Sequence, residues 1–95
     1  MEKQPCVYIM TNKRNGTLYA GVTSNIHKRV SEHVQGQVEG FTKRYHLHRL
    51  VYVEACENMF QAIEREKQIK AGSRKKKLEL IEKENPSWND LSEMI

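Results

Sequence analysis

Two tyrosines on neighbouring apolar segments are the first residues in this chain whose type and spacing suggest chemistry. Tyr8 lies within the apolar run at residues 6–10, and Tyr19 lies in the segment that follows Asn15-Gly16. Asn-Gly between two apolar runs is a strong signal for a β-hairpin. Because side chains alternate along a strand, a loop with an even number of residues would direct both phenol groups to the same face of the hairpin.

The length of the hairpin loop decides how close the two phenol groups lie. A two-residue loop would set Tyr19 opposite Asn12, whereas a four-residue loop would set it opposite Met10 and diagonal to Tyr8. Diagonal neighbours are about 7–8 Å apart at Cα, which long aromatic side chains can bridge. Two half-buried strand tyrosines without a chemical role are the simpler alternative, and spacing alone favours it.

Arg29 and His33 are i, i+4 neighbours on the helix that we expect over residues 25–36. On a helical projection, His33 lies about 20° and Arg29 about 60° from the apolar residue Ile26. Both ionisable groups therefore border the expected buried face, where a fully solvated residue would be unusual. A snorkelling arginine beside a core histidine is the alternative interpretation.

Two glutamates on the second expected helix are the acidic candidates. Glu64 lies beside Phe60 and Ile63 on the apolar face of a helical projection, and Glu66 borders Ile63 from the other side. The periodicity of the apolar residues does not choose between the two carboxylates. A solvated surface glutamate is the alternative in both cases.

Basic residues gather on the two C-terminal helices and in the loop after the first helix. Phosphate contacts by such side chains give salt-sensitive binding that does not depend on nucleic-acid sequence. A solvated charged face explains the helical residues equally well. The expected nucleic-acid-binding residues are Lys43, Arg44 and Tyr45 in the loop, and Arg65, Lys67, Lys70, Arg74, Lys75, Lys76 and Lys77 on the helices.

The segments that must position these residues follow the order β-β-α-β-α-α. We expect strands over residues 5–12, 17–22 and 49–56, and helices over residues 25–36, 58–71 and 74–84. This order predicts an α+β fold with a small three-stranded, mainly antiparallel sheet flanked by helices. Residues 1–95 are expected to form one domain, because a chain of this length supports one modest core.

The first helix is expected to begin at Ser24 as N-cap and to end at Gly36. Its buried stripe would consist of Ile26, Val30 and Val34, which recur every four residues.

The two later helices each follow a polar residue that can cap an N-terminus, Asn58 for one and Ser73 for the other. We expect the C-terminal tail to pack back on the domain through Trp88, Leu91 and Ile95.

Composition leaves the class of binding partner open but indicates the cellular compartment. The chain has 16 Lys and Arg against 12 Asp and Glu, a net charge of +4 that is compatible with a phosphate-rich partner. No apolar stretch approaches the roughly 18 residues that would span a membrane, and the N-terminus does not resemble a signal peptide, so we expect a cytoplasmic protein.

Two other sets of metal-binding residue types have structural explanations. Cys6 and Cys56 lie in or beside apolar runs without a Cys-x-x-Cys spacing, and are expected to be reduced, buried thiols. His46 and His48 have strand-like spacing, and surface or packing histidines are favoured there over a metal site.

The order and spacing of these features resemble the GIY-YIG nuclease superfamily, and its small single-domain members most of all. Cys6-Val7-Tyr8 stands in place of Gly-Ile-Tyr, and Tyr19-Ala20-Gly21 in place of Tyr-Ile-Gly, with ten residues between the tyrosines. Gly21 would then have a structural role, as would Gly16 in the turn. The similarity covers roughly residues 5–85.

The chain departs from the family pattern at several positions. Cys6 replaces the first glycine and Ala20 replaces the isoleucine, both small changes that a strand should accept. Val22 occupies a position where some members carry lysine. The late asparagine of the family corresponds to Asn85 or to Asn89.

The resemblance implies hydrolysis of a phosphodiester with one divalent cation, Mg²⁺ or Mn²⁺. Arg29 would hold the phosphoryl oxygens, and Glu64 would bind the metal. Tyr8 would act as general base, with a nearby metal or arginine lowering its pKa. His33 would relay that proton or act as the base itself, and Tyr19 would position the phosphate or the water. The implied catalytic set is Tyr8, Tyr19, Arg29, His33 and Glu64.

The implied substrate is DNA, with RNA as an open alternative, and repair or recombination is the implied setting. A binding module that has lost efficient catalysis, or a subunit that brings this fold to a protein partner, are the competing interpretations. Because no appended recognition domain is expected, specificity would have to come from a partner, from DNA structure or from dimerisation.

Overall fold

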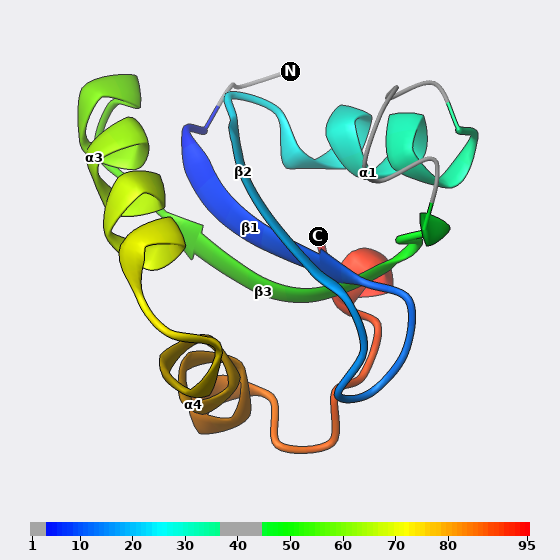
Figure 1. The fold of residues 1–95 in the computed structure, drawn as a ribbon. Coiled ribbons are helices and arrows are strands. Elements are labelled where there is room, and N and C mark those ends of the chain that lie inside the picture. The colour runs from blue at the N-terminus through cyan, green and yellow to red at the C-terminus, as the bar shows by residue number, and fades with distance from the viewer. Residues whose placement is uncertain (1–3, 37–44) are drawn as a thin grey trace.

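The computed structural model describes residues 4–36 and 45–95, which form a three-stranded sheet with helices on both of its faces (Figure 1). The strand order is β2-β1-β3 and both pairings are antiparallel, which confirms the predicted α+β fold. The elements are β1 Cys6–Thr11, β2 Leu18–Thr23, α1 Ile26–Val34, β3 Arg49–Ala55, α3 Met59–Ala71, α4 Arg74–Glu84 and the short 3-10 helix η1 Leu91–Met94.

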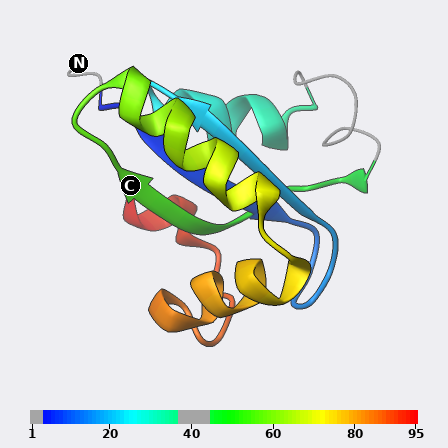
Figure 2. The same ribbon diagram turned by 60° about the vertical axis from the view of Figure 1, so that its left-hand side comes forward.

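The central strand β1 is buried along its whole length. A strand covered on both faces carries a continuous apolar run instead of an alternating one, and residues 6–10 have that composition. Two views show α1 on one side of the sheet and α3 and α4 on the other (Figures 1 and 2). Alternate residues of β1 therefore face two different layers of the molecule.

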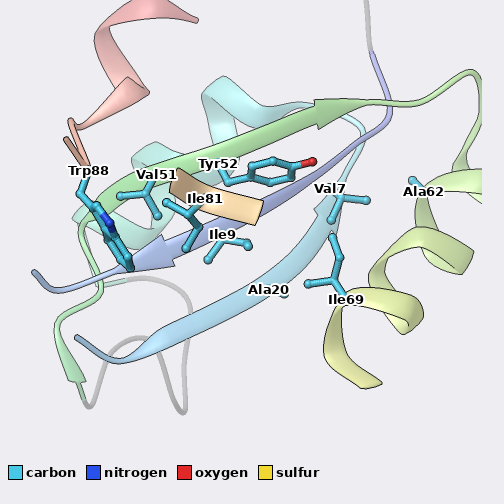
Figure 3. Packing of buried hydrophobic residues seen from close by; sticks show 9 residues of the cluster. All are labelled: Val7, Ile9, Ala20, Val51, Tyr52, Ala62, Ile69, Ile81 and Trp88. Carbon is cyan, nitrogen blue, oxygen red and sulfur yellow. The ribbon is translucent and has the colours of Figure 1, made fainter. Parts of the chain in front are cut away.

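The core between the sheet and the pair α3 and α4 is the larger of the two hydrophobic cores (Figure 3). Trp88 is fully buried in it, and its indole N–H donates a hydrogen bond to Glu82 at 2.9 Å. Truncating a buried tryptophan typically costs about 3–5 kcal/mol. The tail after α4 is thus fixed to the domain, as predicted for Trp88. The cluster consists of Val7, Ile9, Ala20, Val51, Tyr52, Ala62, Ile69, Ile81 and Trp88.

The second core lies on the opposite face, where α1 covers the sheet. Met10, Val30 and Leu50 are buried in it together with Leu47 and Tyr8, and Leu91 of η1 packs against its margin. This core contains Tyr8 and is bordered by Tyr19, so the aromatic rings of the hairpin are held on the α1 side of the sheet.

The turn between β1 and β2 is closed by local hydrogen bonds and anchored from α4. Asn15 takes the left-handed backbone conformation with φ 58°, and the Gly16 N–H donates to the Lys13 carbonyl at 2.9 Å. A Cβ on Gly16 would lie 2.0 Å from Asn12 Oδ1, so a side chain cannot be added without displacing the turn. Arg74 donates to the carbonyls of Asn15 and Gly16, at 2.8 and 2.7 Å.

Several boundary predictions need correction. The N-cap of α1 is Asn25 instead of Ser24, because the Asn25 side chain accepts a hydrogen bond from the Lys28 N–H. Val34 is 50% exposed, so it does not continue the buried stripe of α1. Ile95 is 39% exposed and does not anchor the tail.

The caps of the two later helices are as predicted. Asn58 accepts from the Gln61 N–H and Ser73 from the Lys76 N–H. Among the described residues, no helix has the length and apolarity required to cross a membrane.

Candidate active site

The register of the hairpin places the two tyrosines on one face. Tyr19 pairs with Met10, as the four-residue loop predicts, and its ring centroid lies 6.3 Å from that of Tyr8. Tyr8 pairs with Gly21, and a Cβ at that glycine would lie 2.6 Å from the Tyr8 hydroxyl. The absence of a side chain at Gly21 therefore makes room for the Tyr8 phenol group to lie across β2.

His33 joins the tyrosines from α1. Its side chain is only 2% exposed, and its Nε2 lies 3.0 Å from the Tyr8 hydroxyl. The imidazole centroid is 5.6 Å from the Tyr8 ring and 5.7 Å from the Tyr19 ring, edge-on to both. The sequence predicts His33 at the margin of the buried face of α1, whereas the structure buries it on that face together with Val30. We call Tyr8, Tyr19 and His33 the aromatic cluster.

Burial keeps both hydrogen-bonded partners of the cluster in their neutral forms. The pKa of Tyr8 is raised, first by burial and then by the nearby Tyr19, while Arg29 lowers it to a smaller extent. The pKa of His33 is lowered from 6.5, again first by burial and then by the positive charge of Arg29. The expected lowering of the Tyr8 pKa by arginine is therefore outweighed by desolvation in this structure.

Arg29 borders the aromatic cluster on the same helix. Its Nε atom is buried and has no hydrogen-bond partner among the described residues, and Glu32 approaches it only to 3.7 Å. His33 Nδ1 is likewise buried without a hydrogen-bond partner. Buried polar atoms are usually satisfied, so two such atoms on one helix face indicate a place where a ligand or water completes the contacts.

The acidic residue beside the cluster is Glu66, whereas the predicted Glu64 lies elsewhere. The side chain of Glu66 is 20% exposed and its negative charge acts on Tyr8, where it raises the pKa. Glu64 is 51% exposed, pairs with Lys67 at 3.9 Å, and lines a groove with Glu54 and Phe60. The structure thus does not bring Glu64 to the tyrosines.

The helical projection of α3 explains the error. The sequence pattern predicts Phe60 and Ile63 on the apolar face, but they are 74% and 39% exposed, whereas Ala62 and Ile69 are buried. Glu66 lies about 40° from Ala62 and about 60° from Ile69 on a helix. The pair Ala62 and Ile69, seven residues apart, was the sequence signal that would have selected Glu66.

The basic residues predicted to bind nucleic acid differ in whether their side chains are used in contacts within the protein. Arg65 donates to both oxygens of Glu54 at 3.1 Å, and Arg74 is engaged by the hairpin turn, so both serve internal contacts. Lys70 lies 3.5 Å from Glu66, and its Nζ is 6.0 Å from the centroid of the Tyr19 ring. Lys75 and Lys76 are exposed and Lys77 is half-buried, while Lys43 and Arg44 lie outside the described residues and Tyr45 is exposed.

The side chain of Asn85 is fully used in hydrogen bonds to the backbone. It is buried, its amide donates to the carbonyls of Val51 and Asn89, and its Oδ1 accepts from the Asn89 N–H at 3.0 Å. These bonds close the turn after α4, in front of Trp88. Asn89 itself is exposed.

The other candidate metal-binding residue types do not form a cluster in the part of the chain that the structure describes. No group of three or more histidine, cysteine, aspartate or glutamate side chains converges there. The His46 and His48 rings lie 6.0 Å apart. Both cysteines are free, with Cys6 buried as predicted and Cys56 only half-buried, and burial raises the pKa of the Cys6 thiol to about 11.

A single hard divalent cation fits the residues around the aromatic cluster. Mg²⁺ typically takes one or two carboxylates and fills its other positions with water and phosphate oxygens. Glu66 supplies one carboxylate at the cluster, and the unsatisfied Arg29 Nε offers a donor for a phosphate oxygen.

Known proteins resemble this chain in sequence and in fold. The family model described as the GIY-YIG catalytic domain matches residues 4–79. A UPF0213 protein of Staphylococcus saprophyticus is 41% identical over 75 residues, which cover 79% of this chain and 90% of that protein. A UPF0213 protein of Staphylococcus aureus is 40% identical over 67 residues, 70% of this chain and 82% of the relative.

A solved structure also resembles the whole domain. The solution NMR structure of a UPF0213 protein from Bacillus halodurans superposes with a TM-score of 0.59 at 26% sequence identity, and the match covers 96% of each chain. The names of these relatives specify no reaction, so the nuclease-type function is implied by the matched catalytic domain alone.

Proposed function

Because this chain belongs to the GIY-YIG catalytic domain family, which implies a nuclease-type function, we propose that it is a divalent-metal-dependent endonuclease that hydrolyses phosphodiester bonds in DNA. The observation that carries the proposal is the 3.0 Å contact between the Tyr8 hydroxyl and His33 Nε2. The charges of Arg29, which has an unsatisfied donor, and of the Glu66 carboxylate both act on Tyr8. The proposed catalytic residues are Tyr8, Tyr19, Arg29, His33 and Glu66.

Tyr8 and His33 act together as the path for the proton of the attacking water. With a raised pKa on Tyr8 and a lowered pKa on His33, the phenol is protonated and the imidazole neutral near pH 7. The Tyr8 O–H therefore donates to Nε2. As water gives a proton to the phenol oxygen, the phenol proton passes to His33, which becomes an imidazolium. A bound phosphate brings negative charge that favours this imidazolium.

Arg29 binds the phosphoryl group and the charge that develops on it. Its Nε donor is buried, makes no hydrogen bond among the described residues and is paired with Glu32 only at 3.7 Å, so a phosphate oxygen would complete its contacts. Arg29 also opposes premature protonation of His33, because its charge lowers the pKa of the imidazole. Tyr19 lies against both other rings of the cluster and positions the phosphate or the water.

Glu66 would hold the divalent cation, Mg²⁺ or Mn²⁺. A cation bound there would supply positive charge to the phosphate oxygens and would lower the pKa of a coordinated water. Lys70 faces the same carboxylate at 3.5 Å and balances its charge when no cation is present. Lysines on the adjacent part of α4 (Lys75, Lys76 and Lys77) provide sequence-independent contacts to the DNA backbone.

The experiment that tests the proposal compares two glutamates of one helix. Supercoiled plasmid, single-stranded DNA and branched DNA are incubated with Mg²⁺ or Mn²⁺ and with wild type, Glu66→Gln or Glu64→Gln. A metal ligand contributes several kcal/mol to the transition state, so we expect Glu66→Gln to lose about 100-fold or more in cleavage. Glu64→Gln should cleave as wild type does, because its side chain faces another groove.

Two outcomes would overturn the proposal. If Glu64→Gln lost activity while Glu66→Gln kept it, the metal assignment would be wrong. If wild type bound DNA tightly but cut none of the three substrates with either metal, the chain would be a binding module that retains the nuclease fold.

A further inference from the structure

A pocket of about 310 Å³ lies beside the proposed active site, where the edge strand β2 meets α3 and α4. Its volume is within the range of small-ligand sites, at the lower end. Figure 2 shows α3 passing over the sheet on this side, with α4 below it next to the hairpin turn. The lining residues are Ile9, Leu18, Tyr19, Ala20, Lys70 and Lys77.

The lining combines an apolar floor with positive charge alone. Ile9, Leu18 and Ala20 provide aliphatic surface, and Tyr19 provides an aromatic ring. Both charged side chains are lysines, whose methylene stems extend the apolar walls while their ammonium groups stay at the rim. A ligand that suits this surface has a flat, unsaturated body and carries a negative charge. A nucleotide, with its base and its phosphate, has this chemistry.

Two residues connect the pocket to the aromatic cluster. The Tyr19 ring lines the pocket and also lies 5.7 Å from the His33 ring, centroid to centroid. Lys70 lines the pocket and lies 3.5 Å from Glu66, the proposed metal ligand. An occupant of the pocket is therefore a close neighbour, along a DNA strand, of the phosphate that the cluster would cleave.

We infer that this pocket receives an unpaired nucleotide of the DNA substrate, with its base against Tyr19 and Leu18 and its phosphate at Lys77. The inference rests on the proposed function. A base within an intact duplex is stacked and paired, so it cannot enter a pocket in a protein surface without being extruded. Only a flap, a bulge or a single strand presents a base without that cost, and stacking on an aromatic ring tolerates any base. The pocket thus selects DNA structure instead of DNA sequence.

A duplex backbone resting on the lysines alone is the competing explanation for the positive charge. That arrangement requires Lys70 and Lys77 but leaves the apolar floor without a partner. The apolar floor and the lysines both gain a partner only if a base and its phosphate bind together. A binding assay can therefore distinguish an unpaired nucleotide from a duplex backbone.

The test measures binding without metal, so that it does not depend on cleavage. One probe is a nicked duplex that carries a single unpaired 2-aminopurine nucleotide as a flap, and the other is the same duplex fully paired. We expect wild type in EDTA to bind the flap probe about tenfold more tightly by fluorescence anisotropy, the size of one stacking contact. The fluorescence of 2-aminopurine should change on binding as the base meets Tyr19.

Three variants separate the pocket from general charge. Leu18→Trp fills the floor, and Lys77→Glu reverses the charge at the rim, so both should bind the two probes equally. Lys76→Glu makes the same charge change at the neighbouring residue, which lies outside this pocket. It should weaken the binding of both probes alike and keep the preference for the flap probe. Thermal melting verifies that each variant is folded, and Lys77→Glu, at a half-buried position, still tests the site if Leu18→Trp is unstable.

Two results would overturn the inference, namely equal binding of both probes by wild type, or a preference that persists in both pocket variants. Cleavage assays with Mg²⁺ keep this inference distinct from the proposed function. A flap preference without any cleavage would support the nucleotide pocket and contradict the proposed nuclease activity. Cleavage without a flap preference would support the nuclease activity and contradict the nucleotide pocket.

Discussion

Both faces of the sheet bury a tyrosine in a polar cluster, and the two clusters differ in how their polar atoms are satisfied. On the α3 face, the Tyr52 hydroxyl donates a hydrogen bond to Glu54, and Arg65 Nε donates to both oxygens of that carboxylate at 3.1 Å. The hydroxyl, the carboxylate and the guanidinium each have partners within the protein. Burial, with help from the hydrogen bond to Glu54, raises the pKa of Tyr52 to about 12.

On the α1 face, not every buried polar atom has a hydrogen-bond partner among the described residues. Tyr8 has His33 as its hydrogen-bond partner, but His33 Nδ1 and Arg29 Nε are buried without one. No carboxylate hydrogen-bonds to Tyr8 among the described residues, and the negative charge of Glu66 acts on it without such a bond.

The two clusters thus differ in whether their buried polar atoms all have hydrogen-bond partners. A raised tyrosine pKa is common to both clusters, so it does not by itself mark a functional site. Buried donors without partners are costly and are retained chiefly where something else binds them. The Tyr52 cluster joins β3 to α3, whereas the Tyr8 cluster keeps two buried polar atoms without a hydrogen-bond partner among the described residues, which supports the phosphate contact that we propose there. Three experiments test this contrast.

The largest contrast is expected from removing one hydroxyl on each face. Tyr8→Phe keeps the ring above Gly21 but removes the contact with His33, so we expect cleavage to fall about 10²- to 10⁴-fold, the range for loss of a general base. Its free energy of unfolding should fall by about 1–3 kcal/mol, because His33 Nε2 is left buried without its hydrogen-bond partner. Tyr52→Phe should lose a comparable amount in denaturant unfolding, about 1–2 kcal/mol, but its cleavage should be unchanged.

Rates of plasmid nicking and urea unfolding curves on the same preparations measure both quantities. If Tyr52→Phe lost cleavage while remaining folded, the two clusters would not be functionally different, and the assignment of the α1 face as the site would fail.

A smaller effect is expected from exchanging arginine for lysine on each face. Arg29→Lys keeps the charge but loses the planar fork and the unsatisfied Nε donor, so we expect cleavage to fall about 10- to 100-fold. Arg65→Lys weakens a half-exposed ion pair worth about 1 kcal/mol or less and should leave cleavage unchanged. Equal rates for wild type and Arg29→Lys would show that charge alone is needed there and that the Nε donor has no role.

The same contrast explains which features could be predicted from the sequence. The hairpin, the antiparallel sheet and the caps at Asn58 and Ser73 are set by local chemistry: an Asn-Gly turn, an apolar run and side chains that accept a backbone N–H. These signals act over a few residues, and the structure follows them.

The candidate site depends on contacts between segments that are distant in the sequence, and fewer of its contacts could be predicted. Parity of the hairpin indicated that the tyrosines could share a face, but the hydrogen bond from Tyr8 to His33 joins residues 25 positions apart. The choice between Glu64 and Glu66 required knowing that Ala62 and Ile69, and not Phe60, face the sheet. The use of Arg65 and Arg74 in internal contacts was likewise invisible, since a charged residue in a sequence does not reveal its partner.

The smallest predicted effect is a dependence of stability on pH that comes from the α1 face alone. Burial and the charge of Arg29 lower the pKa of His33 below its ordinary value of 6.5, although Glu32 opposes the shift and His48 adds to it. The unfolded chain therefore binds a proton at His33 at a higher pH than the folded protein does. By linkage, this contribution to stability is fully present above about pH 6.5 and is lost as the pH falls through the lowered pKa of the folded state.

Urea unfolding at a series of pH values between 7.5 and 5 measures this slope, in a range where most carboxylates do not yet titrate. His33→Gln should be less stable at pH 7.5, because it disturbs the contact with Tyr8, but its stability should decline less steeply towards pH 5 than that of wild type. His27→Gln, at an exposed histidine of the same helix, should keep the wild-type slope. The Tyr52 cluster contains no histidine, so Tyr52→Phe should keep that slope as well. If His33→Gln and wild type declined in parallel, His33 would not be the buried neutral acceptor that the proton path from Tyr8 requires, and the distinction between the two faces would then rest on Arg29 and Glu66.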